Sequence, residues 1–157
     1  MERFQITKEG FERLKILLDN LKNVERPTII KAIATAREHG DLKENAEYQT
    51  AKDRQGFIEA QISDFEDKVA RAEVIDISKI SGDKIKFGAT VALEDLDSGR
   101  KVTYKIVSDF EADIDLGLIS GISPVARALI GKEVGDEVEV RTPGGVTNYE
   151  ILEIKFV

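Results

Sequence analysis

The spacing of apolar residues changes near residue 80, and this change limits the possible folds more than any other feature of the sequence. Before it, apolar side chains recur every three or four residues, which is the period of an amphipathic helix. After "SGDK" at 81–84 they alternate with polar side chains, which is the period of a strand. The sequence therefore predicts an α+β protein with a helical N-terminal domain, 1–77, and a β-rich C-terminal domain, 78–157.

Two segments of the N-terminal half carry the helical pattern, and we expect them to pair as an antiparallel coiled-coil hairpin. Thr7 is the predicted N-cap of the first segment, and Pro27 should kink it or restart it as a first-turn proline, giving two helices end to end. An unbroken helix over 11–38 would extend on the order of 40 Å, so the hairpin should project. The apolar positions are Phe11, Leu14, Leu18 and Leu21, then Ala51, Ile58, Ile62, Phe65, Val69 and Ala72, with Gln55 as a polar member of the second set.

The C-terminal half predicts a mostly antiparallel sheet with one short helix. The helix is expected in "SPVARALIGKEVGD", with Ser123 as its N-cap, Pro124 at its first position and Gly131 as its stop. The strands are rich in β-branched and aromatic residues and are separated by turn signals such as "DLDSGR" and "TPGG". They are expected within 85–93, 101–108, 137–141 and 148–157.

Charge and cysteine content exclude several kinds of function. The 157 residues carry a formal net charge of −7, so a general basic surface for nucleic acid is excluded. The chain has no cysteine, which excludes disulfides and thiolate metal sites. The N-terminus lacks the pattern of a signal peptide, and nowhere do about 18 apolar residues run together. We therefore expect a cytosolic protein that does not bind membranes.

The stretch "GDLKENAEYQTAKDRQ", 40–55, joins the two arms and is unusually polar. Gly40 is suited to end the first arm. His39 before it is either a solvated residue at the helix end or a metal ligand, and the second role would have to do without another histidine or a thiolate in the chain. Asp41 and Glu44 have the spacing of a capping box. At the exposed end of a hairpin they could instead supply oxygen ligands to Mg²⁺, although two carboxylates are only part of such a site.

The segments "EHGDLKENAEYQTAKDRQ" and "SPVARALIGKEVGDEVEVRTPGG", together with the long hairpin, closely resemble the bacterial Gre family of transcript cleavage factors. The resemblance covers essentially the whole chain and is specific, because both motifs occur in the expected order. It implies an FKBP-like C-terminal domain that docks on RNA polymerase near the mouth of its secondary channel. It also implies that the hairpin reaches through this channel toward the active centre.

The resemblance further implies a role on backtracked polymerase, where the RNA 3′ end is extruded. Asp41 and Glu44 would then help the polymerase hold its second Mg²⁺ and position a water, so that the nascent RNA is hydrolysed. Hydrolysis by two metal ions is limited by a weakly held second ion until more carboxylate is supplied. The polymerase would remain the enzyme, and this chain, expected to act as a monomer, would have no cofactor of its own.

Further site residues follow from the same resemblance. Asn45, Glu47 and Tyr48 would orient the tip carboxylates or the RNA, or would be first-turn helix residues without such a role. Arg37 and Lys52 match a basic spot that contacts extruded RNA, or are ordinary surface charges.

Docking on polymerase is expected at "ISPVARALIG", through Ser123, Pro124 and Arg127, although helix-start and packing roles explain this segment equally well. Two rival functions remain open, an inhibitor of polymerase on the same scaffold and an FKBP-like peptidyl-prolyl isomerase or chaperone. The tip pattern "GDLKENAEY" favours the activator over the inhibitor. An isomerase pocket should be lined by aromatic residues, whereas the chain has no tryptophan. Its C-terminal aromatic residues are spread over the predicted strands: Phe87, Tyr104, Phe110, Tyr149 and Phe156.

Overall fold

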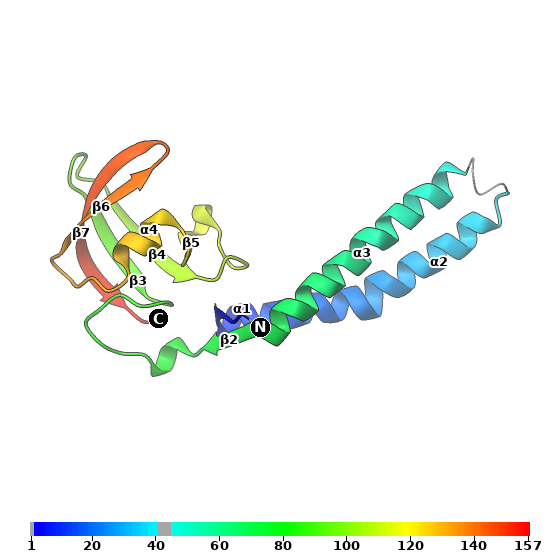
Figure 1. Cartoon of the computed structure of the whole chain (residues 1–157), viewed down its shortest axis with the longest axis horizontal. Helices are drawn as coiled ribbons and strands as arrows, with labels where there is room; N and C mark the ends of the chain where they lie inside the picture. Colours follow the sequence, from blue (N-terminus) through cyan, green and yellow to red (C-terminus); the bar gives the residue numbers. More distant parts are fainter. Residues whose placement is uncertain (1, 41–44) are drawn as a thin grey trace. The chain divides into compact units, whose positions relative to one another are not determined.

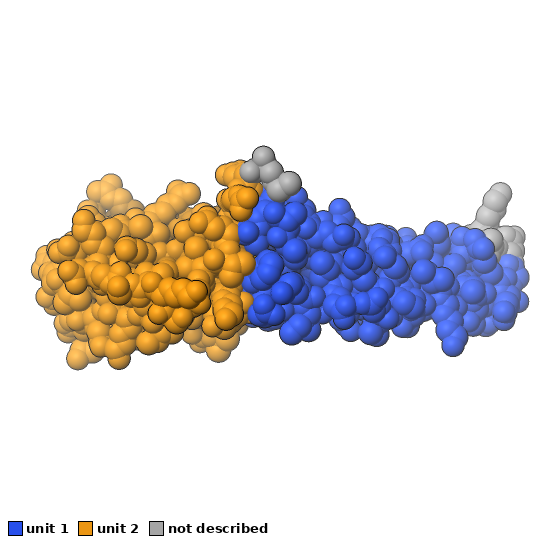
Figure 2. Space-filling model, turned by 90° about the horizontal axis from the view of Figure 1, so that it is seen from below, with its two compact units in different colours: residues 1, 11–72 blue, residues 2–10, 73–157 orange. Residues whose placement is uncertain are grey.

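The computed structural model describes residues 2–40 and 45–157 (Figure 1). By their internal contacts they form two compact units, shown in different colours in Figure 2. We call residues 11–72 the hairpin unit, and residues 2–10 with 73–157 the sheet unit. The elements in chain order are β1 (Phe4–Thr7), α1 (Lys8–Asn20), a π-helical turn (Leu21–Glu25), α2 (Arg26–Arg37), α3 (Ala46–Arg71), β2 (Ala72–Ile75), a 3₁₀ turn (Ile77–Lys79), β3 (Thr90–Asp95), β4 (Lys101–Val107), a second 3₁₀ turn (Ile114–Leu116), β5 (Leu118–Ser120), α4 (Pro124–Leu129), β6 (Glu137–Thr142) and β7 (Gly145–Lys155).

The hairpin unit is built on the antiparallel pair α2 and α3, which lie side by side (Figure 1). The α3 side of their apolar seam follows the predicted positions, because residues three and four apart share a helix face, whereas Ile29 and Ile33 of α2 were not among the predicted positions. Leu18, Tyr48 and Phe65 pack on the seam from positions that are partly buried. The buried core residues are Leu21, Ile29, Ile33, Ala51, Ile58 and Ile62.

Pro27 lies in the first turn of α2, directly after the π-helical turn, so α1 and α2 run end to end as predicted. A proline at this position cannot donate to the carbonyl of Asn23, and its ring would crowd that carbonyl in a regular α-helix. The wider turn over Leu21–Glu25 accommodates the proline. The hydroxyl of Thr28 donates to the carbonyl of Val24 over 2.6 Å, which gives that carbonyl a side-chain partner.

Two ion pairs connect the arms of the hairpin on its surface. The guanidinium of Arg26 donates two hydrogen bonds to the carboxylate of Glu59, of 2.7 and 2.8 Å. Arg54 on α3 donates to Glu25 before α2, over 3.2 Å. The Arg26 pair is bidentate, which fixes its geometry better than a single contact does. Both pairs join residues about thirty positions apart, so they favour one alignment of the two helices.

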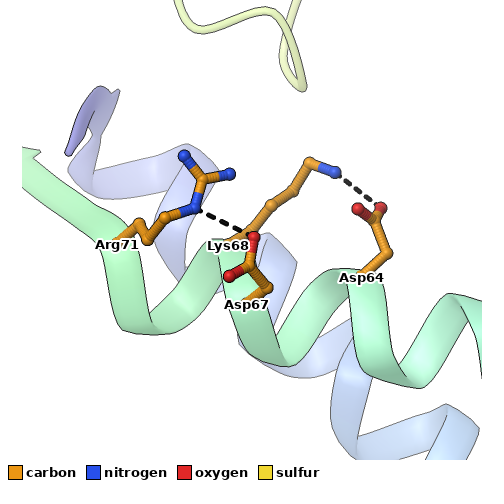
Figure 3. A network of polar contacts seen from close by, with 4 residues as sticks. All are labelled: Asp64, Asp67, Lys68 and Arg71. Carbon is orange, nitrogen blue, oxygen red and sulfur yellow. Dashed lines mark hydrogen bonds and ion pairs between the residues drawn. The ribbon is translucent and has the colours of Figure 1, made fainter. Parts of the chain in front are cut away.

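Near its C-terminal end α3 carries two ion pairs along its own surface (Figure 3). Lys68 binds Asp64 over 2.5 Å and Arg71 binds Asp67 over 2.9 Å, in both cases one helical turn apart. Each acid precedes its base, the order that agrees with the helix dipole, and each pair is worth about 0.3–0.5 kcal/mol.

Within the part of the chain that the structure describes, no helix is both long enough and apolar enough to cross a membrane.

The sheet unit contains a five-stranded sheet in the order β5-β4-β3-β7-β6. All neighbours are antiparallel except β4 and β5, which confirms the predicted sheet. A bulge interrupts the β3–β7 register between Ala92 and Leu93. The core lies between this sheet and α4, and it includes Ile85, Val91, Leu93, Ile106, Ala126, Leu129 and Ile151.

The strand predicted over 85–93 is wrong in its first half, since β3 begins only at Thr90. Gly88 has a φ of +89°, a left-handed conformation that turns the chain. A Cβ at this position would lie 2.5 Å from Cγ2 of Ile77, so close packing also requires glycine. The alternating pattern here reflects the burial of Ile85, Phe87 and Ala89 in the core. These side chains are buried although the segment does not form a regular strand.

A two-stranded sheet of β1 and β2 was not predicted from the sequence. Each strand has only four residues, too few for alternation to separate a strand from a helix end. Because β1 contacts β4, residues 2–10 pack with the sheet unit, although the helical spacing assigned them to the N-terminal domain.

Candidate functional site at the hairpin tip and on α4

The first arm of the hairpin ends at Arg37, and a short turn leads from it to Gly40, the predicted stop. The N–H of Glu38 donates to the carbonyl of Thr35, and that of His39 to the carbonyl of Ala36, which satisfies the last turn of α2. Gly40 follows with a φ of +116°, a conformation that strongly favours glycine. His39 lies in the turn after α2, and not in its last helical turn as predicted.

Asn45 is the N-cap of α3. The Oδ1 atom of Asn45 accepts the N–H of Tyr48 over 3.0 Å, and its Nδ2 donates to the carbonyl of Ala36 over 2.6 Å. One side chain therefore starts α3 and binds the end of α2. Asp41 and Glu44 lie outside the described residues, so both their capping box and their metal role stay predictions.

The other predicted orienting residues have partners across the tip. Glu47 lies 3.4 Å from Nδ1 of His39, from the opposite arm. Tyr48 packs on the hairpin core, and the guanidinium of Arg37 lies 6.0 Å from the centre of its ring. Such cation–π contacts are worth roughly 0.5–1 kcal/mol at exposed sites. Contacts from side chain to side chain thus fix the two helix ends relative to each other.

Arg37 and Lys52, the predicted basic spot, lie on opposite helices and are both exposed. Lys52 donates to Oε1 of Gln55 over 3.2 Å, and Arg37 stacks on Tyr48. Neither makes an ion pair with a carboxylate that the structure describes, and their contact with RNA stays a prediction. Within 2–40 and 45–157, no group of three or more histidine, aspartate or glutamate residues could hold a metal ion.

On the sheet unit, the predicted helix α4 is confirmed with its cap and stop. The Oγ atom of Ser123 accepts the N–H of Ala126 over 3.2 Å, and Gly131 follows the helix with a φ of +88°. Because Pro124 and Arg127 are three residues apart, they share one face of α4, and both are exposed. Ser123 is only partly exposed and serves the helix start, so Pro124 and Arg127 are the more accessible candidates for docking.

A groove of about 330 Å³ lies beside α4. Two exposed apolar residues flank the helix, Ile122 at 65% and Ile130 at 43% of full exposure. Both lie within the predicted docking segment 122–131, although only Ser123, Pro124 and Arg127 in it were predicted as contacts. Apolar side chains beside an arginine are typical of protein–protein interfaces. The groove is lined by Arg127, Ala128, Lys132, Glu137, Val138 and Glu139.

Two family models match the chain. Residues 4–74 match "Transcription elongation factor, N-terminal", and residues 80–156 match "Transcription elongation factor, GreA/GreB, C-term". The first match therefore covers the hairpin with its tip, and the second covers the sheet with α4.

Individual proteins match over the full length. The chain is 57% identical over 157 residues to transcription elongation factor GreA of Phenylobacterium zucineum, with 100% of both chains covered. It is 53% identical over 156 residues to GreA of Rhodospirillum rubrum, with 99% of both covered. The crystal structure of GreA factor homolog 1 (Gfh1) of Thermus thermophilus is 31% identical, with 98% of this chain and 99% of that chain covered and a TM-score of 0.45. The chain belongs to the GreA/GreB family of transcription elongation factors.

Proposed function

We propose that this elongation factor rescues backtracked RNA polymerase by inserting its hairpin tip through the secondary channel. There it stimulates cleavage of the nascent RNA near its 3′ end. The observation that carries the proposal is that the polar sequence 40–48 follows α2 and includes the first turn of α3, at the end of the helix pair. A long helix pair that carries polar residues at its end suits side chains that must act inside another protein.

Asp41 and Glu44 are the residues assigned to the reaction. Mg²⁺ takes six ligands, and two carboxylates are too few to hold it in water. Asp41 and Glu44 therefore act only when the polymerase supplies the remaining ligands. When bound there, the ion activates water and stabilises charge on the phosphate. The catalytic centre thus belongs to the polymerase, and this chain is a partial donor of ligands and not an enzyme.

The described residues support this role by position and charge. Asn45 holds the ends of both arms together, so the tip loop starts and ends at fixed points. Arg37 and Lys52 bind the phosphates of the extruded RNA. The surface of α4, with Pro124 and Arg127, docks on the polymerase, and a single copy of the chain suffices.

The test compares the parent with Asp41→Asn/Glu44→Gln in RNA cleavage by a backtracked polymerase complex in Mg²⁺. The amides remove charge and keep shape, and the N-cap Asn45 is untouched. We expect the variant to bind polymerase like the parent and to lose most of the stimulation. An Asp83→Asn/Glu66→Gln variant removes two exposed acids elsewhere and should cleave normally. Equal cleavage by the tip variant and the parent would refute the assignment.

A further inference from the structure

Glu111 is an acid in an unusual place. It follows β4 in the sheet unit and is only 7% exposed. It makes no ion pair with any lysine, arginine or histidine that the structure describes. A buried carboxylate is costly unless hydrogen bonds replace the lost water. The hydrogen bonds that it accepts should therefore show why it is there.

Two of these bonds come from Thr7 and two from Ser108. The N–H of Thr7 donates to Oε2 over 3.2 Å, and its hydroxyl donates to Oε1. The N–H and the hydroxyl of Ser108 donate to Oε2 over 3.1 and 2.8 Å. Ser108 is a local neighbour, whereas Thr7 is 104 residues away. Half of the donors thus come from the far end of the chain.

Thr7 is the last residue of β1 and the N-cap of α1. Its hydroxyl oxygen accepts the N–H of Gly10 over 3.1 Å, as an N-cap does. The carboxylate of Glu111 consequently lies at the positive end of α1, where a negative charge is favoured. The first turn of α1 belongs to the sheet unit, and from Phe11 the same helix belongs to the hairpin unit.

Gly10 makes room for the side chain of Glu111 because it has no side chain of its own. A Cβ at this position would overlap the carboxyl carbon and Oε1 of Glu111 and would lie 2.6 Å from its Cγ. A glycine inside a helix is otherwise unfavourable. The close approach of Glu111 therefore explains the residue. We call Thr7, Gly10, Ser108 and Glu111 the Glu111 cluster.

We propose that Glu111 is a positioning residue for transcript cleavage, an inference that rests on the function proposed above. By binding Thr7 it fastens the start of α1 to the unit that docks on the polymerase. The tip at the other end of the hairpin can then place its carboxylates reproducibly in the polymerase. Without this attachment the docked factor would still bind but would deliver its tip poorly, because small misplacements of reacting groups are costly.

Two variants test the inference from opposite sides. Glu111→Ala removes the carboxylate, and Gly10→Ala displaces it while improving the helix. Gly56→Ala in α3 is the matched control, since a Cβ there meets nothing within 4 Å. We expect both test variants to lower cleavage at saturating factor on the order of tenfold, with affinity for polymerase changed less than about twofold. Gly56→Ala should match the parent, and Glu111→Gln should recover part of the loss, because its carboxamide can still accept from Ser108 and Thr7.

A second measurement does not depend on polymerase. The chain has no cysteine, so spin labels can be placed on new cysteines at the exposed Lys31 and Asp97, one in each unit. The distance distribution between the labels should broaden in Glu111→Ala and Gly10→Ala, and not in Gly56→Ala. Hydrogen exchange of β3 and β4 reports in parallel whether the sheet stays folded.

The outcomes separate the two proposals. If the parent fails to stimulate cleavage, the proposed function is wrong, and the distance distributions still decide whether Glu111 fixes the start of α1. If the parent is active, parental cleavage by Glu111→Ala and Gly10→Ala at saturation overturns the inference. Unchanged distance distributions overturn it as well.

Discussion

The side-chain amide of Asn45 donates a 2.6 Å hydrogen bond to the main-chain carbonyl of Ala36, and so joins the start of α3 to the end of α2. The carbonyl of Ala36 also accepts the N–H of His39, so the bond from Asn45 is a second one to the same oxygen at the end of the helix. The same side chain caps α3 through Tyr48. The two ends of the tip loop are therefore held by a single residue.

Replacing Asn45 should loosen the tip. Asn45→Ala removes both the cap and the bond to Ala36, and we expect it to lower the free energy of unfolding of the hairpin by about 1–2 kcal/mol. Asn45→Asp keeps the cap but cannot donate to Ala36, and it places a negative charge at the C-terminal end of α2. Urea unfolding followed by far-UV circular dichroism should rank the parent first, then Asp, then Ala. Equal stability of Asp and parent would mean that the Ala36 bond contributes nothing.

The hairpin should weaken in acid through one identified pair. The hydrogen bond from Arg26 lowers the pKa of Glu59 below its ordinary value of 4.5. The unfolded chain therefore binds this proton more readily, so the contribution of the pair is present above about pH 4.5 and is lost as the pH falls through the folded pKa. In a carbon NMR titration, Arg26→Gln should return the pKa of Glu59 toward 4.5. Arg54→Gln, which removes the other arginine that pairs across the arms, should leave it lowered.

The two units have separate cores, so a cavity in one should leave the other intact. Ile58 is 1% exposed in the hairpin core, and Leu93 is fully buried in the sheet core. Truncating either to alanine should cost about 2–5 kcal/mol in its own unit. Hydrogen exchange resolved by peptide should show lost protection in α2 and α3 for Ile58→Ala, and in β3, β4 and β7 for Leu93→Ala. Equal losses in both units for either variant would show that they unfold as one.

Docking and folding should separate on α4. Ser123→Ala removes the helix cap and should cost about 1 kcal/mol of stability. Arg127→Ala removes an exposed side chain and should leave the melting temperature unchanged. We expect it to weaken polymerase binding on the order of tenfold, as loss of an interface arginine can. Arg100→Ala, in the exposed turn between β3 and β4, is the control. Unchanged affinity for Arg127→Ala would move the docking surface away from the groove.

Much of this architecture could be predicted from local patterns. The α3 side of the hairpin seam follows from apolar spacing, and the Thr7 cap, the restart at Pro27 and the Ser123–Pro124 helix start follow from residues that suit only a few backbone positions. Such signals are local, because each depends on bonds within one turn of helix.

The cap of α3 shows where local patterns fail. The sequence predicts Asn45 only as an orienting residue of the tip or a first-turn helix residue, whereas the structure places it at the N-cap of α3. Its second hydrogen bond goes to the carbonyl of Ala36, which is within reach only once the two arms have paired. Similarly, the alternation of Ile85, Phe87 and Ala89 predicted a strand, because these side chains are buried. The left-handed conformation of Gly88 prevents a regular strand there.

The sequence by itself determined the helical hairpin, the mostly antiparallel sheet, and the polar tip with its family resemblance, because periodicity and capping act over a few residues. Only the tertiary structure decided that residues 2–10 pack with the sheet and that Glu111 binds Thr7. A buried carboxylate is tolerated only where enough donors converge on it. Two of those hydrogen bonds come from Thr7, which is 104 residues from Glu111 in the sequence, and only the folded chain brings the two residues together.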